Sequence, residues 1–130
     1  MLAHAIAHAA ARDGTRLATR VEIAKMNPRD SIWVGTGQMP VGVRPFQREL
    51  ESEADRLGVH IMASAGFDPA ALAAYIDRMQ PAHDTSAQVP SPLPPVEKRV
   101  ADLEQAIGEL PAQSYSSGTE FQAIQNEVRQ

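Results

Sequence analysis

Residues 4–8 read His4-Ala5-Ile6-Ala7-His8 and stand in a segment rich in alanine, leucine, arginine and glutamate. These residue types favour helix, so the sequence predicts one helix over residues 2–25, with Gly14 as its weakest point. Asn27-Pro28 marks its end. Residues four apart share one face of a helix. His4 and His8 are therefore expected to present both imidazoles to the same side.

This histidine pair is a candidate zinc site, because two imidazoles on one helix face can bind a single ion. Metalloproteases with a His-Glu-x-x-His motif place a glutamate directly after the first histidine, where its carboxylate takes a proton from the metal-bound water. Ala5 occupies that position here, and a methyl group accepts no proton. The pair thus predicts metal binding without catalysis. Standing alone, the same spacing also fits ordinary polar or packed histidines.

A second motif, Glu51-Ser52-Glu53-Ala54-Asp55, lies in a helix expected from about Pro45 to Ala65, with Gly66 as its stop. Glu51 and Asp55 are four apart and face one way, whereas Glu53 points elsewhere. Catalytic zinc typically takes three protein ligands and keeps a position for water. One carboxylate can therefore ligate, while the other accepts the free N–H of a ligating histidine.

The rest of the chain predicts further helices and loops. Asp68-Pro69 starts a third helix that reaches about Met79, a fourth covers about 95–110, and a short last one covers roughly 119–128. Segment 29–44 reads as an irregular loop or a short strand pair, and the proline-rich segment 80–95 as a loop. We therefore predict a mainly α fold of about five helices in a single domain over 1–130.

Composition limits the partners that this chain can have. The net charge of −4 without a dense basic stripe argues against a nucleic-acid partner. The absence of cysteine excludes disulfides and thiolate zinc ligands. No stretch approaches the roughly 18 apolar residues that a transmembrane helix needs.

Together, the histidine pair and the run from Glu51 to Gly58 resemble the gluzincin zinc metallopeptidases, a family that includes BepA, HtpX and the CAAX prenyl endopeptidases. The likeness is greatest to the soluble BepA-like branch. It extends through Ala65-Gly66-Phe67-Asp68-Pro69-Ala70-Ala71 and through the run from Leu93-Pro94-Pro95 to Arg99-Val100, and covers most of the chain.

This resemblance implies zinc ligated by His4, His8 and Glu51, with Asp55 supporting a histidine. It further implies a peptide or unfolded-protein substrate and a bacterial periplasmic or envelope location. Arg99 is expected to form a structural ion pair or to pack near the site rather than to act in catalysis.

Two departures from the family pattern are Ala5, in place of the catalytic glutamate, and Leu93, in place of a histidine. The family also carries strands and a helix before the first motif. The chain is therefore expected to match the C-terminal part of a catalytic domain, in an inactive and truncated form. The alternatives are a natural pseudopeptidase that binds peptides or partners, and a metal-free helical interaction module.

Several other polar or aromatic residues are interpreted without a site role. We expect Glu49 and Glu53 to be solvated helix charges, and His60 and His83 to lie at the surface or in a loop. Trp33 is expected to pack under its loop.

Overall fold

The computed structural model describes the chain except for residues 30–31, 33–39, 80–90, 92, 117–125 and 128–130. The described residues form five α-helices and one short 3₁₀ turn, Val41–Val43, with no β-strand among them. The predicted mainly α fold is confirmed. His83 and Trp33, whose positions were predicted from the sequence, lie outside the described residues. Most of the expected last helix, residues 119–128, also lies outside them. None of the described helices is long and apolar enough to cross a membrane.

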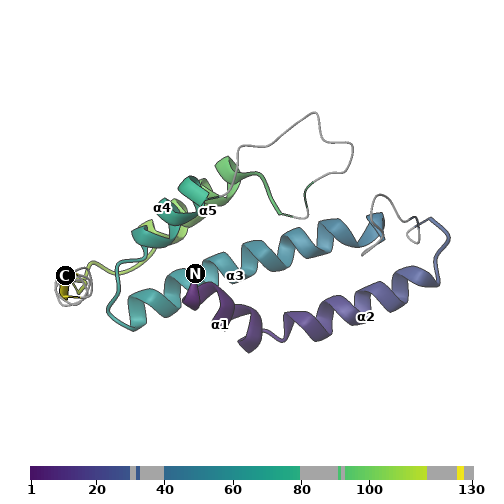
Figure 1. Cartoon of the computed structure of the whole chain (residues 1–130), viewed down its shortest axis with the longest axis horizontal. Helices are drawn as coiled ribbons and strands as arrows, with labels where there is room; N and C mark the ends of the chain where they lie inside the picture. Colours follow the sequence, from purple (N-terminus) through teal and green to yellow (C-terminus); the bar gives the residue numbers. More distant parts are fainter. Residues whose placement is uncertain (30–31, 33–39, 80–90, 92, 117–125, 128–130) are drawn as a thin grey trace.

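The first helical segment differs from the prediction, because it consists of two helices. α1 spans Leu2–Ala10 and α2 spans Asp13–Lys25. Between them Arg12 adopts a left-handed conformation with φ 57°, the one non-glycine residue with positive φ among those described. The chain therefore turns at residues 11–12 rather than weakening at Gly14. Figure 1 shows the two helices meeting at an angle.

α3, Arg44–Ser64, is the long central helix. It lies between α1 and α2 on one side and α4 and α5 on the other (Figure 1). Pro45 stands in its first turn, where the missing N–H costs no helical hydrogen bond. Gly66, with φ +79°, follows its end and allows the left-handed turn that other residues resist. The predicted bounds of this helix are confirmed to within a residue at each end.

Segment 29–44 is described only in part. The Val41 N–H donates to the Ile32 carbonyl at 2.8 Å, and the 3₁₀ turn then leads directly into α3. This contact brings Ile32 and Val41 together and fits either a loop or a short strand pair, and residues 30–31 and 33–39, on which that choice depends, lie outside the described residues.

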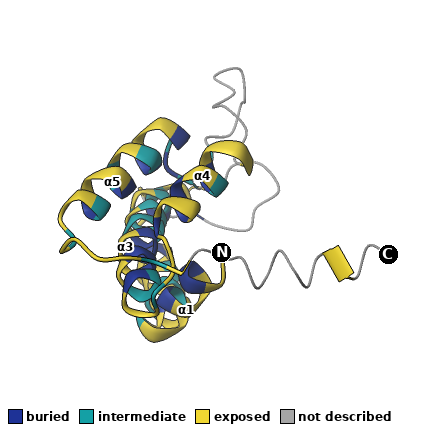
Figure 2. Ribbon diagram, turned by 90° about the vertical axis from the view of Figure 1, so that its left-hand side faces the viewer, coloured by how far each residue is buried: buried dark blue, intermediate teal, exposed yellow. Residues whose placement is uncertain are grey.

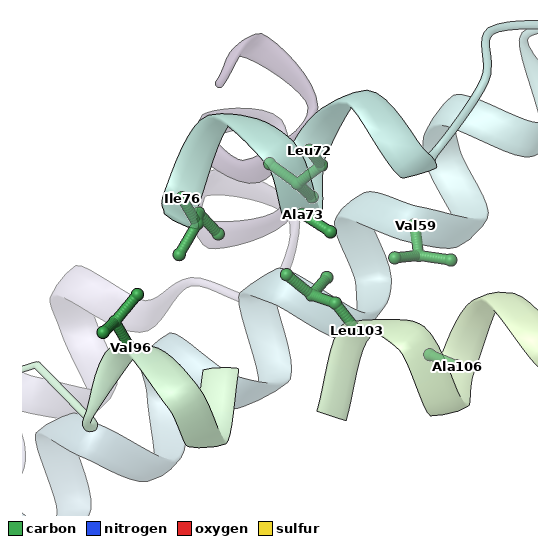
Figure 3. Close-up of a cluster of buried hydrophobic side chains, with 7 residues drawn as sticks. All are labelled: Val59, Leu72, Ala73, Ile76, Val96, Leu103 and Ala106. Carbon is green, nitrogen blue, oxygen red and sulfur yellow. The ribbon is translucent and has the colours of Figure 1, made fainter. Parts of the chain in front are cut away.

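α4, Ala70–Met79, and α5, Val96–Gly108, cover the other side of α3. The Asp68 carboxylate accepts a hydrogen bond from the Ala70 N–H at 2.9 Å, as expected of a helix cap. Buried side chains from α3, α4 and α5 form one apolar core (Figure 3), which consists of Val59, Leu72, Ala73, Ile76, Val96, Leu103 and Ala106.

α1 packs closely on α3, and Gly58 permits this contact. A Cβ atom at Gly58 would lie 3.5 Å from the His4 backbone nitrogen and 3.3 Å from Leu72 Cδ2. A methyl group there would meet the α1 backbone at an ordinary contact distance and would be tight only against the Leu72 side chain of α4, so little spare room is left between the helices. In Figure 2, buried stretches of α1 lie beside α3, with which α1 is in contact. The close packing brings the histidines of α1 against the carboxylates of α3.

Candidate metal centre

His4 and His8 lie on one face of α1, as their spacing predicts. Their Nε2 atoms are 3.0 Å apart, and the rings meet edge to face with centroids 4.6 Å apart. The His4 side chain is 9% exposed and that of His8 is 28% exposed. Both imidazoles therefore direct Nε2 toward one point. Solvent reaches this point more easily from the side of His8.

Glu51 of α3 completes this cluster. Its two carboxylate oxygens lie 3.5 Å from His4 Nε2 and 3.6 Å from His8 Nε2. One donor atom from each of the three residues falls within 4.8 Å of the others. Two imidazole nitrogens bound to tetrahedral zinc at about 2.0–2.1 Å lie roughly 3.4 Å apart, so the observed separations need only small adjustments to hold such an ion.

Asp55 lies beneath His4, one helical turn after Glu51. Its Oδ1 is 2.8 Å from His4 Nδ1. Arg99 of α5 donates two hydrogen bonds of 2.7 Å to the same carboxylate, from Nε to Oδ2 and from Nη2 to Oδ1. The side chains of Asp55 and Arg99 are 3% and 6% exposed. Arg99 thus forms the ion pair expected of it and holds Asp55 in place.

These carboxylates change the acid–base properties of His4. Its pKa is raised from 6.5 to about 9, first by the contact with Asp55 and then by that with Glu51. The contact with His4 lowers the pKa of Glu51 below its usual value. Burial pushes the pKa of Asp55 upward, but His4 and Arg99 outweigh this effect and lower it. The cluster therefore favours a positive charge between its carboxylates, which a proton or a metal cation can supply.

His8 has a carboxylate partner that the sequence did not indicate. Asp13, the first residue of α2, places Oδ2 at 2.8 Å from His8 Nδ1. Its Oδ1 accepts a 2.9 Å hydrogen bond from Arg16 Nη1. The side chain of Asp13 is 6% exposed. Its place five residues after His8 gave no signal, because only the turn at Arg12 brings it back under the ring.

The remaining candidates lie around this centre. Ala5 is exposed on α1 directly after His4. Glu53 points away from the histidines and forms a 2.7 Å ion pair with Arg16 of α2. His60 is exposed on α3.

Comparison with known proteins identifies the family of this chain. The model of peptidase family M48 matches residues 1–107, a range that includes every residue of the centre. The chain belongs to peptidase family M48. Members of this family are metallopeptidases and are generally zinc-dependent. The resemblance found in the sequence is thereby confirmed at the level of the family.

Individual proteins that match this chain share little sequence identity with it. The beta-barrel assembly-enhancing proteases of Escherichia coli K12, Shigella flexneri and Escherichia coli O157:H7 are each 28% identical to this chain over 85 residues. The match covers 62% of this chain and 17% of each relative, so the chain spans about a sixth of their length. No solved structure matches the chain.

Proposed function

We propose that this chain is the zinc-binding helical part of an M48 endopeptidase domain, in a form whose general base is replaced by Ala5. The observation that carries the proposal is the convergence of His4, His8 and Glu51, whose donor atoms lie within 4.8 Å of one another. Two imidazoles and one carboxylate are a donor set that suits catalytic zinc and leaves a fourth position for water.

The surroundings of the three donors also fit zinc. A ligating histidine commonly directs its other ring nitrogen to a carboxylate, which fixes the tautomer and the ring orientation. Asp55 and Asp13 stand in that position for His4 and His8, respectively. Both Nε2 atoms therefore face one point, where a bound cation would take the place of the proton that the raised pKa of His4 favours.

When bound, zinc would polarise a water molecule and a substrate carbonyl. The protein must then provide a base for the water proton, and in the His-Glu-x-x-His arrangement the residue after the first histidine supplies it. Ala5 has no proton-accepting group. Loss of a general base typically lowers the rate by roughly 10²–10⁴-fold, so turnover is expected to be negligible.

We extend the proposal to the intact parent protein. Relatives are named beta-barrel assembly-enhancing proteases, and we propose by analogy that the parent cleaves unfolded or misassembled proteins in a bacterial envelope. Residues 1–130 are proposed to belong to one catalytic domain.

A second candidate is a pseudopeptidase that binds peptides or partner proteins without cutting them. Besides Ala5, an apolar cavity of about 780 Å³ favours it. The cavity lies beside the start of α1 and the end of α3, and its apolar lining includes Leu2, Ile6, Ile61, Met62, Phe67 and Tyr115.

Substitution Ala5→Glu separates these candidates. It restores the His-Glu-x-x-His motif at an exposed position that has room for a longer side chain. We expect the rate of zinc-dependent casein hydrolysis to rise above that of the unaltered chain. The increase should be about 10²-fold or less, which is the lower end of the roughly 10²–10⁴-fold that a general base contributes. The gain should be small because the described residues include no strand to hold an extended peptide.

The assay compares the unaltered chain and Ala5→Glu, each with zinc and with a chelator. Hydrolysis by Ala5→Glu in the presence of zinc, and in none of the other three samples, supports the peptidase proposal. Measurable and equal zinc-dependent hydrolysis by the two proteins would show that Ala5 is not at the position of the base. Zinc binding by both proteins with no hydrolysis in any sample would favour the pseudopeptidase.

A further inference from the structure

Asp13 is a buried carboxylate. It lies outside the motifs that resemble known peptidases and that indicated the candidate ligands. It contacts His8 through one oxygen, at 2.8 Å, and Arg16 through the other, at 2.9 Å. A buried carboxylate needs such partners, because its desolvation is otherwise costly. The pair of contacts fixes the direction in which Asp13 faces the imidazole.

The backbone is turned sharply to place Asp13 there. In a continuous helix at 3.6 residues per turn, a residue five after His8 would point about 140° away from it around the axis. Arg12 instead takes the left-handed conformation, with φ 57° and ψ 38°, and α2 starts at the next residue. A non-glycine residue in that conformation is strained and persists only where its surroundings enforce it. Here the turn brings Asp13 back under His8.

Each histidine consequently has a carboxylate beside its Nδ1, from a different part of the fold. His4 Nδ1 faces Asp55, which Arg99 holds, and His8 Nδ1 faces Asp13, which Arg16 holds. In each pair the carboxylate leaves Nε2 directed at the other histidine and at Glu51.

We propose that Asp13 is a positioning residue for His8, one that fixes its Nδ1–H tautomer and ring orientation for metal binding, and that Arg16 orients Asp13. This inference rests on the proposed metal site. Arg16 also reaches Glu53 on α3 at 2.7 Å and lies over the Phe46 ring with its guanidinium carbon 5.7 Å from the centroid. It therefore links the helix that bears Asp13 to the helix that bears Glu51.

A purely structural role for Asp13 makes a different prediction. An acidic residue in the first turn of α2 interacts favourably with the helix dipole. Loss of that interaction would lower the stability of the metal-free protein. It would leave the zinc affinity of the folded protein unchanged, because affinity is measured on molecules that are already folded.

The test measures zinc affinity by competition with a chromophoric chelator, for the unaltered chain, Asp13→Ala and Asp13→Asn. Replacing a carboxylate that orients a ligand weakens metal binding by roughly 10–100-fold, and we expect this loss for Asp13→Ala. Asp13→Asn should lose less, because its amide oxygen still accepts from Nδ1–H. Asp102→Ala is the control, since that carboxylate pairs with Lys98 on α5.

Nuclear magnetic resonance of the zinc-loaded protein provides a second readout. The Nδ1–H proton of His8 should resonate far downfield beside Asp13 and move upfield in Asp13→Ala. Affinity and resonance equal to those of Asp102→Ala would overturn the inference. If Asp13→Ala does not fold, unchanged affinity and resonance in Asp13→Leu, which has a similar size but no acceptor for Nδ1–H, would overturn it. Absence of zinc binding by the unaltered chain would overturn both this inference and the proposed function, whereas normal binding by the variants would overturn this inference alone.

Discussion

His8→Ala and Glu51→Ala are each expected to abolish stoichiometric zinc binding. Each substitution removes one of the three donors that the fold brings within 4.8 Å of one another, and two remaining ligands hold zinc weakly. Elemental analysis of the tag-free protein after dialysis should find about one zinc per unaltered chain and far less in either variant. The stoichiometry is a proposal that follows from the single cluster among the described residues.

Thermal unfolding gives an independent measure of the same binding. A ligand that binds only the folded state stabilises it by about 2.7 kcal/mol at a concentration one hundred times its dissociation constant. Zinc should therefore raise the melting temperature of the unaltered chain and of His60→Ala, the control at an exposed histidine of α3. It should leave His8→Ala and Glu51→Ala unchanged. Equal zinc content and equal stabilisation in all four proteins would rule out the assigned ligands.

Arg99→Ala is expected to lower the free energy of unfolding by about 3–5 kcal/mol, even without metal, because it leaves the buried Asp55 carboxylate without its arginine partner. Arg99 joins α5 to α3 through two 2.7 Å hydrogen bonds, and its side chain is 6% exposed. Urea denaturation followed by circular dichroism measures this change.

The neighbouring Lys98 provides a matched control. Its ion pair with Asp102, at 2.6 Å, is exposed on the same helix, with side chains 61% and 33% exposed. Exposed pairs contribute no more than about 1 kcal/mol, so Lys98→Ala should change stability little. Arg99→Ala that is already unfolded without urea would agree with the prediction. A loss no larger than that of Lys98→Ala would show that Asp55 does not depend on Arg99.

Local signals account for the parts of the fold that the sequence predicted well. Pro45 in the first turn and Gly66 after the last turn mark the limits of α3, and the Asp68 cap marks the start of α4. The four-residue spacings of His4 with His8 and of Glu51 with Asp55 depend only on helix geometry. These features could be predicted because each is decided within one or two turns of chain.

Non-local packing decides the features that could not be predicted. Arginine has no intrinsic preference for the left-handed conformation, so nothing local marked the turn at Arg12, and the sequence placed the weak point at Gly14. Asp13 was missed for the same reason. Arg99 was expected either to form an ion pair or to pack near the site, but its partner Asp55 stands 44 residues away and was not predicted. Only the packing of α5 on α3 selects that partner.

X-ray absorption spectroscopy at the zinc edge of the zinc-loaded chain tests the central claim, that His4, His8 and Glu51 hold one ion, most directly. The account predicts a shell of light ligands with two imidazole nitrogens at about 2.0–2.1 Å, together with oxygen from the carboxylate and from water. Multiple scattering from two imidazole rings should be visible. A shell of oxygen atoms alone, as expected for zinc held by surface carboxylates, would contradict the account.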